Sequence, residues 1–279
     1  MKKNVFFMAM PVIALALGMA VLSCGNGTTN GTTGKVFIYS DFRNAMGQNG
    51  DKLCVIDEGK VKFYGLMDDS GAQITEFWWG DTKYTWGEIK EYQLILPAGY
   101  KGAFIGPNNN LCVVVDGKVK SYHNFGDGWI EYASDFALPS GYKGLFGLGF
   151  NLCVLVGDKI MFYEENNAAW KASLNYEAFT LPSGFSSVFV RYEGDTPVLY
   201  VTIGDKIRTY QYGNGWEARG SDGWDWKEQF DAEEASLPSS AKLIGYFHEN
   251  DPDYGAQAVV ADDRIIFGSS DIPEFTIPK

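Results

Sequence analysis

The feature that most constrains the fold of this chain is a short motif that recurs along it. Its clearest copies are Leu96-Pro97-Ala98-Gly99-Tyr100, Leu138-Pro139-Ser140-Gly141-Tyr142 and Leu181-Pro182-Ser183-Gly184-Phe185. Two weaker copies begin at Leu237 and Ile277. The copies are 42, 43, 56 and 40 residues apart, and self-similarity at such spacings is the signature of a repeat architecture. The motif therefore predicts five structural repeats.

A second pattern in the same repeats predicts their strands. In each repeat, Leu-Cys-Val or a related apolar run is followed by a turn and a basic residue. The basic residues are Lys60, Lys118, Lys159, Lys206 and Arg264. An alternating run such as Lys60-Val61-Lys62-Phe63-Tyr64 comes next, and a Gly/Asp turn between two such runs indicates a hairpin. Each repeat thus predicts four strands, which we letter a to d, with d ending at the Leu-Pro.

These repeats predict an all-β fold, a five-bladed β-propeller of four-stranded antiparallel blades. Four-stranded repeats of about this length are typical of blades that close into a ring. We place the propeller at residues 35–279, with blades at about 35–100, 101–142, 143–185, 186–241 and 242–279. An open or sandwich arrangement is the alternative. The pattern loosely resembles hemopexin-type and tachylectin-type propellers in architecture and repeat length, and this resemblance implies no functional residues.

The N-terminal residues have the pattern of an export signal. Lys2 and Lys3 precede an apolar stretch over residues 5–22, so residues 1–23 are predicted to be a signal peptide. The tetrapeptide Val21-Leu22-Ser23-Cys24 resembles the bacterial lipobox. This resemblance implies cleavage before Cys24, a diacylglycerol on its thiol and acylation of the new amine by a chain such as palmitate. Two or three such chains anchor a protein stably. An ordinary cleaved signal with a chance cysteine is the alternative.

The residues after Cys24 predict where the folded part is held. Residues 24–34 are polar and rich in Gly, which is typical of a flexible tether. The residue after Cys24 is Gly25 rather than Asp, which in enterobacteria favours sorting to the outer membrane. We therefore expect a lipid-anchored protein of the bacterial cell envelope. We place it at the outer membrane, either on the periplasmic side or at the cell surface.

The net charge limits the possible partners. The formal net charge is −12, and it becomes more negative once Lys2 and Lys3 are removed with the signal. An acidic surface repels phosphate backbones, so we expect no nucleic-acid binding. Adsorption to anionic lipid through a basic patch is also disfavoured. The membrane is expected as a partner only through the covalent lipid on Cys24.

The sequence contains no recognisable catalytic or metal-binding motif. The two histidines, His123 and His248, lie in different repeats, and no His-Glu-x-x-His, Gly-x-Ser-x-Gly or P-loop spacing occurs. We expect no catalytic residues, no metal and no cofactor, and we do not expect an enzyme. The repeated cysteines Cys54, Cys112 and Cys153 are predicted to be buried, reduced thiols packed between blades. A disulfide or metal site is the alternative at these positions.

The eight tryptophans fall into two groups. Trp86, Trp129, Trp170 and Trp226 recur shortly before the Leu-Pro, and a repeated position indicates packing between blades. The others lie in two predicted c–d insertions, residues 65–85 and 213–225. From these insertions we name as candidate ligand-binding residues Trp78, Trp79, Tyr84, Trp216, Trp224 and Asp222. The alternative is that these aromatic side chains fold back and cap the insertions.

Loop lengths predict which face of the propeller binds. In an up-and-down blade the a–b and c–d connections share one face, and the b–c and d–a connections share the other. The long loops are predicted on the first face, at residues 41–51, 191–197 and 248–255 and in the two insertions. Elaborated loops on a rigid scaffold commonly bind ligands, and exposed aromatic residues suit sugar rings or protein partners.

The sequence therefore predicts a lipid-anchored envelope protein that recognises a glycan or a protein through the a–b/c–d face. Two alternatives stay open. One is a propeller glycan hydrolase with carboxylates at the central channel. The other is a structural subunit of an envelope complex.

Overall fold

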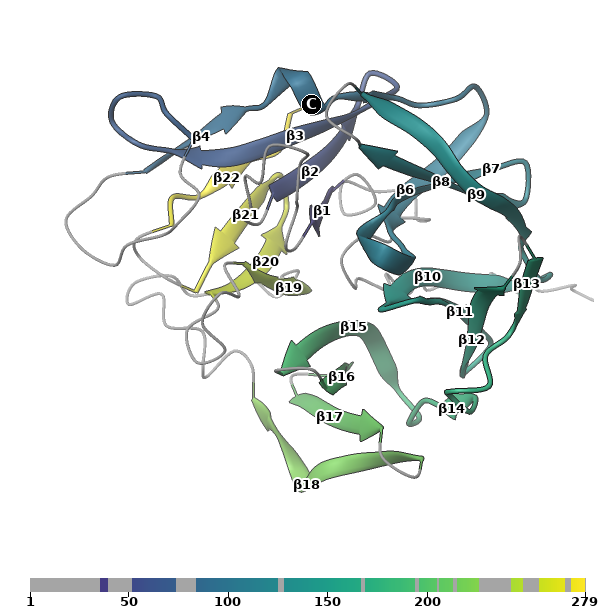
Figure 1. The fold of residues 1–279 in the computed structure, drawn as a ribbon. Coiled ribbons are helices and arrows are strands. Elements are labelled where there is room, and N and C mark those ends of the chain that lie inside the picture. Colours follow the sequence, from purple (N-terminus) through teal and green to yellow (C-terminus); the bar gives the residue numbers. More distant parts are fainter. Residues whose placement is uncertain are drawn as a thin grey trace, which may run out of the picture.

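The computed structural model contains five antiparallel sheets arranged as a ring, which is a five-bladed β-propeller (Figure 1). It describes residues 36–39, 52–73, 84–124, 128–166, 169–193, 196–204, 206–212, 215–225, 242–247, 256–268 and 272–278. The predicted all-β fold class and the number of blades are confirmed.

Each blade is formed by one continuous stretch of chain, and its strands pair in sequence order. Blade 1 contains β1 (Val36–Tyr39), β2 (Lys52–Asp57), β3 (Lys60–Met67), β4 (Thr85–Glu88) and β5 (Leu94–Ile95). Blade 2 contains β6 (Tyr100–Ile105), β7 (Leu111–Val115), β8 (Lys118–Asn124) and β9 (Trp129–Ala137). Blade 3 contains β10 (Tyr142–Leu148), β11 (Asn151–Val156), β12 (Lys159–Asn166), β13 (Ala169–Ala172) and β14 (Phe179–Thr180). Blade 4 contains β15 (Phe185–Glu193), β16 (Thr196–Ile203), β17 (Lys206–Tyr212) and β18 (Trp216–Asp225). Blade 5 contains β19 (Lys242–Phe247), β20 (Ala256–Ala261), β21 (Arg264–Phe267) and β22 (Phe275–Thr276).

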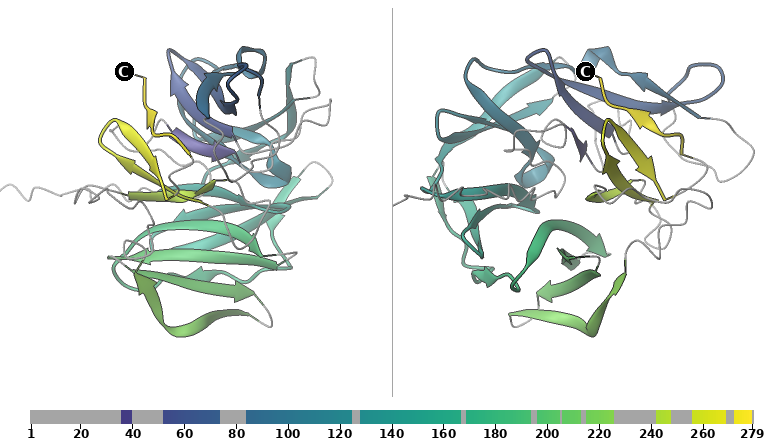
Figure 2. Two further views of the ribbon diagram at one scale, coloured as in Figure 1. Left: turned by 90° about the vertical axis from the view of Figure 1, so that its left-hand side faces the viewer. Right: turned by 180° about the vertical axis from the view of Figure 1, so that it is seen from behind.

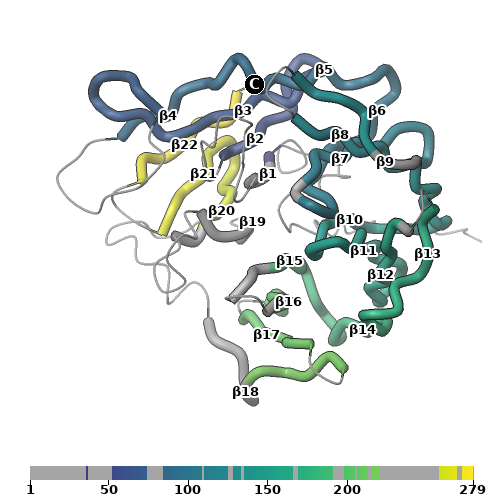
Figure 3. Tube along the Cα trace, viewed as in Figure 1, coloured from purple at the N-terminus to yellow at the C-terminus, as the bar shows by residue number. Residues whose placement is uncertain are grey.

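The first strand of every blade lies at the centre of the ring, and the last lies at its rim (Figure 1, Figure 2). The chain passes once around the ring from blade 1 to blade 5 (Figure 3). In blades 1 and 3 the outer strand is split, so that β4 and β5 both pair with β3, and β13 and β14 both pair with β12. Two short 3₁₀ helices, η2 (Lys90–Tyr92) and η3 (Pro107–Asn109), connect strands in blades 1 and 2.

Strand b is buried on both sides because a neighbouring blade covers each side. In β2, Leu53 and Val55 belong to the core shared with blade 5, whereas Cys54 belongs to the core shared with blade 2. All three side chains are completely buried. The alternation follows from the two-residue period of a strand. It also explains why this strand is apolar at every position in the sequence pattern.

Three of the predicted packing tryptophans each contact the preceding blade. Trp86 stacks on Phe267 of blade 5, with ring centroids 5.4 Å apart. Trp129 stacks on Phe63 of blade 1 at 5.5 Å, while Trp170 meets Phe136 of blade 2 edge-on at 5.5 Å. These predictions of a packing role are confirmed.

In blade 4, the contact with the preceding blade that corresponds to these three is made by Trp216. Trp216 begins β18 and stacks on Phe162 of blade 3, with ring centroids 5.5 Å apart and the ring planes 18° apart. The predicted insertion over residues 213–225 is therefore wrong, because most of it is the outer strand itself. Trp226 lies outside the described residues.

Two of the predicted loop positions differ in the structure. Because β18 ends at Asp225 and β19 begins at Lys242, the extra residues of the fourth repeat fall in a d–a connection. The irregular a–b loop predicted at residues 191–197 is also wrong, because β15 and β16 continue to Glu193 and from Thr196 as one hairpin. The long c–d connection of blade 1, between Met67 and Thr85, is confirmed.

Side-chain packing between blades 1 and 5 closes the ring. One core cluster combines Val36, Leu53 and Val55 with Val260 and Ile265. The inner strands β1 and β19 lie side by side at the same seam. Within the part of the chain that is described, no helix is long and apolar enough to cross a membrane.

Candidate binding face

The structure places the predicted ligand-binding residues in three different situations. Trp78 and Trp79 lie outside the described residues, as does the predicted lipid-bearing Cys24. Trp224 and Asp222 lie in β18, where Trp224 pairs with Ile207 of β17. The remaining two residues have packing roles.

Tyr84 belongs to a core between blades, and the partly buried Trp216 packs against another. Tyr84 is only 6% exposed and belongs to the core shared by blades 1 and 5. Trp216 is surrounded by Phe162, Tyr176 and Tyr212, with ring centroids 5.2–5.9 Å away. These contacts agree with the alternative that such aromatic side chains fold back against the scaffold. Neither ring therefore belongs to the site described below.

The exposed apolar side chains indicate a different location. The large apolar residues that are exposed in the described part of the chain are Ile95, Ile130, Tyr132, Phe150 and Leu174. Ile130, Tyr132 and Phe150 lie near the a–b/c–d ends of blades 2 and 3, at the start of β9 and in the β10–β11 turn. Ile95 pairs with Lys60 at the opposite face, and Leu174 lies on the outer rim between β13 and β14.

A polar pair lies beside these apolar side chains in blade 2. Asn110 immediately precedes β7 and is 4% exposed, and His123 lies near the end of β8. Their side chains are joined by a hydrogen bond of 2.8 Å between His123 Nδ1 and Asn110 Oδ1. Because an amide oxygen only accepts hydrogen bonds, Nδ1 carries the proton and donates it. The bond fixes the direction of the imidazole ring.

The outer strand of blade 2 continues this polar pair towards the rim. His123 pairs with Ile130, and Ser121 pairs with Tyr132 two residues further along the same strands. Directly paired residues project from the same side of a sheet, and here that side faces blade 3. Ile130 is 55% exposed and Tyr132 is 51% exposed, and the Tyr132 ring lies 6.2 Å from the His123 ring.

Towards the centre of the ring, the inner turns of blades 2 and 3 meet beside Asn110. Asn108, which is exposed, donates its backbone N–H to the Gly149 carbonyl with a distance of 2.7 Å. Phe150 follows Gly149 at the tip of the β10–β11 turn and is 75% exposed. A Cβ on Gly147 would overlap the backbone of Gly106, so only glycine allows the two blades to approach this closely.

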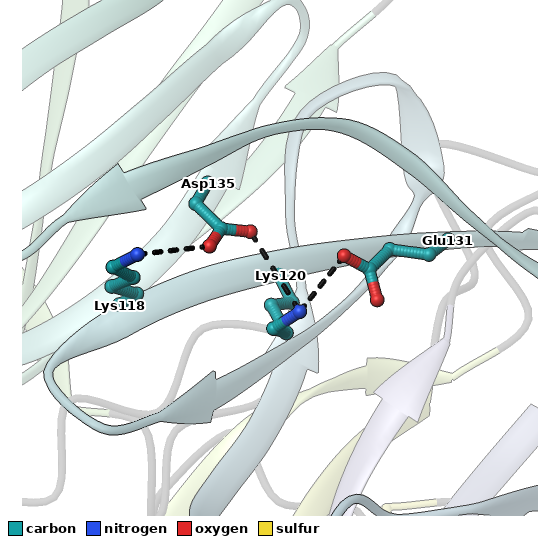
Figure 4. A network of polar contacts seen from close by, with 4 residues as sticks. All are labelled: Lys118, Lys120, Glu131 and Asp135. Carbon is teal, nitrogen blue, oxygen red and sulfur yellow. Dashed lines mark hydrogen bonds and ion pairs between the residues drawn. The ribbon is translucent and has the colours of Figure 1, made fainter.

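An ion-pair network on the other side of β9 holds that strand in place (Figure 4). Lys120 Nζ lies 2.8 Å from Glu131 Oε1, and Lys118 Nζ lies 3.2 Å from Asp135 Oδ2. Asp135 lies where the register of β9 against β8 shifts, between the Val119 and Ser121 pairs. The network thus connects β8 to β9 on both sides of the irregular segment. Exposed pairs of this kind contribute little free energy individually.

We call the resulting feature the radial row, because it extends from the inner turns to the rim of blade 2. It consists of Asn108, Asn110, His123, Ile130, Tyr132 and Phe150. It extends from the β6–β7 turn across β7, β8 and β9, a width of roughly 10–14 Å at the usual strand spacing. The exposed rings at both ends, together with the exposed Asn108 and the half-buried His123, can bind a ligand with apolar and hydroxyl surfaces.

The sequence interpretation missed the radial row because it followed loop length. Both a–b turns involved are short. Two sequence features could have indicated the row. One is the aromatic residue at a turn tip in Gly149-Phe150-Asn151, and the other is the amide-rich run Pro107-Asn108-Asn109-Asn110. Neither signal by itself shows that the two turns meet.

The repeated thiols below this face are chemically protected. Cys54, Cys112 and Cys153 are reduced and completely buried, which confirms their predicted structural role. Burial raises the pKa of the Cys112 thiol to about 12, although a contact with Ser121 Oγ at 3.3 Å opposes the shift. The pKa of Cys153 is also raised well above its usual value by burial. Both groups remain protonated near neutral pH and are poor nucleophiles.

Among the described residues, no three His, Cys, Asp or Glu side chains lie close enough together to hold a metal ion.

No protein-family model and no curated protein sequence matches this chain. The fold and the candidate site therefore rest on the sequence and the structure of this chain itself.

Proposed function

We propose that this protein is a lipid-anchored binding module of the bacterial cell envelope, which recognises a glycan or a protein through its a–b/c–d face. The observation that carries the proposal is the radial row. Three of the exposed large apolar side chains, Ile130, Tyr132 and Phe150, lie along it with polar groups beside them. Exposed aromatic residues with hydrogen-bonding neighbours are typical of recognition surfaces.

The anchor is supported by the lipobox-like residues 21–24 and by the polar tether that follows them. We expect the full chain, expressed in a bacterium, to incorporate labelled palmitate and to sediment with membranes. Cys24→Ser should remove the label and the membrane association, because it removes the thiol that receives the diacylglycerol. Palmitate labelling that survives the substitution would contradict the predicted site of attachment.

Chemical blocking of one face tests the binding proposal. Ala169 is exposed at the a–b/c–d face of blade 3, and Asp158 is exposed in a b–c turn of the same blade. Each is changed to Cys in the Cys24→Ser background and coupled to a large maleimide–polyethylene glycol. The coupling is selective because the three native thiols of the blades are buried.

Both coupled proteins are then applied to arrays of glycans and of envelope proteins. We expect the polymer on the Ala169→Cys variant to abolish binding, and the polymer on the Asp158→Cys variant to leave it unchanged. Binding that survives a block at Ala169 but not at Asp158 would assign recognition to the opposite face. Absence of binding by the unmodified chain to both arrays would refute the proposed function.

A further inference from the structure

We infer that the ligand of the a–b/c–d face is a neutral, extended oligosaccharide that lies along the radial row, with one sugar ring on Phe150 and another on Tyr132. This inference rests on the proposed function and specifies its site and ligand class. It follows from the spacing of the rings, from the polar groups between them and from the charge of the chain.

Phe150 provides the inner contact. Its ring is 75% exposed although the turn that carries it is held by the hydrogen bond between Asn108 and Gly149. An exposed ring on a fixed turn presents an apolar face without a large entropic cost on binding. The apolar C–H face of a pyranose fits such a ring. The exposed Asn108 amide beside it can bond to hydroxyl groups at the edge of the sugar.

Tyr132 provides the outer contact, at the far end of the row. It lies on the outermost strand of blade 2, two to three strand spacings from the β6–β7 turn, a distance of roughly 10–14 Å. One pyranose cannot reach both rings, whereas a short chain of them can. Tyr132 therefore contributes only when the ligand is long enough to cross the row.

The middle of the row distinguishes a glycan from a protein partner. The half-buried His123, which the buried Asn110 holds by a hydrogen bond, lies between the two rings, so the apolar surface is not continuous. A protein interface normally has a continuous apolar centre surrounded by a polar rim. Alternating apolar and polar groups match a chain of sugars, whose ring faces alternate with hydroxyl-bearing edges.

The charge of the chain indicates a neutral ligand. The formal net charge is −12, and none of the six residues of the radial row is Lys or Arg. Anionic polysaccharides and phosphate-bearing polymers would therefore be repelled, and no cation of the row would compensate. Flat β-linked chains of neutral pyranoses are the ligand class that fits both the width and the charge.

The test uses the full chain in detergent micelles and two neutral probes, cello-oligosaccharides and chito-oligosaccharides from one to six sugars in length. Calorimetry gives the Kd for each length. We expect the affinity to rise with length until the chain spans the row and then to level off. Phe150→Ala should weaken binding at every length by roughly tenfold, which corresponds to ~1.4 kcal/mol.

Tyr132→Ala separates the inference from a general effect on the face. It should leave the Kd of the shortest probes unchanged and remove the gain that the longer probes show. Leu174→Ala and Ile95→Ala are matched controls, since both side chains are large, apolar and exposed but lie outside the row. Both controls should bind like the parent chain. Circular dichroism checks that all four variants remain folded.

The outcomes distinguish this inference from the proposed function. No binding by either probe series, or equal losses for Tyr132→Ala at all lengths, would overturn the inference. A protein ligand whose binding is blocked at Ala169 would retain the proposed function and also overturn the inference. Failure of the face-blocking experiment would overturn both.

Discussion

The tryptophans at the blade seams differ in how their indole N–H groups are satisfied. Trp129 Nε1 donates to the Tyr92 carbonyl at 2.7 Å, and Trp86 Nε1 donates to the Pro273 carbonyl at the same distance. Trp216 Nε1 is buried and has no hydrogen-bond partner among the described residues. A buried donor without an acceptor costs about 1–3 kcal/mol. Trp216 therefore stabilises its seam through stacking and shape alone.

This difference predicts that replacement by Phe destabilises the fold more at Trp129 than at Trp216. Trp129→Phe keeps a ring beside Phe63 but removes the bond to Tyr92, so it should destabilise the fold. Trp216→Phe keeps a ring beside Phe162 and removes the unsatisfied donor. We expect the free energy of unfolding of Trp129→Phe to be about 1–2 kcal/mol lower than that of Trp216→Phe. Urea unfolding followed by circular dichroism measures both values.

The lost ring volume is the same in the two variants, so their difference isolates the hydrogen bond. Equal destabilisation by both substitutions would show that the bond to Tyr92 contributes nothing to stability. A larger loss for Trp216→Phe would show that its N–H is satisfied in solution.

The positions of most strands could be predicted from the sequence, because short repeated patterns determine them. The repeated motif indicated where each inner strand lies, but β6, β10 and β15 already begin at Tyr100, Tyr142 and Phe185, which the predicted blade bounds assigned to the preceding blades. The prediction of the outer strand was wrong in the fourth repeat, because the residues before Leu237-Pro238 fit the pattern of strand d as well as Trp216–Asp225 do. Pairing with β17 decides between them, and it places Trp224 opposite Ile207. Such a choice depends on tertiary contacts that a repeat pattern does not contain.

The candidate site was less predictable than the strands for a related reason. Its parts come from separate elements, and the fold alone brings them together. Asn110 and His123 meet because β7 and β8 are neighbours, and Asn108 meets Gly149 because two blades pack closely at Gly106 and Gly147. Loop length favoured the a–b/c–d face partly through a fourth-repeat insertion that is really an outer strand, and it selected Tyr84 and Trp216, whose rings pack in or against the cores between blades.

The whole ring has one seam that differs from the others. Blades 1 and 5 contain the two ends of the propeller, and no described strand of one blade pairs with the sheet of the other. Elsewhere the polypeptide itself connects adjacent blades. The closing seam therefore depends on side-chain packing, and Trp86 is central to it through its contacts with Phe267, Phe275 and Pro273.

Trp86→Ala should consequently open the ring locally, whereas Trp170→Ala should not. Both substitutions remove a large packed ring and should lower the free energy of unfolding by about 3–5 kcal/mol. Only at the closing seam can the two blades separate while the rest stays folded. We expect hydrogen exchange in Trp86→Ala to accelerate selectively in β2 and β20, with β7 and β11 far less affected. In Trp170→Ala, where the chain still joins blades 2 and 3, exchange should rise more evenly. Uniform acceleration in both variants would show that the propeller unfolds as a single cooperative unit, with a closing seam as strong as the other four.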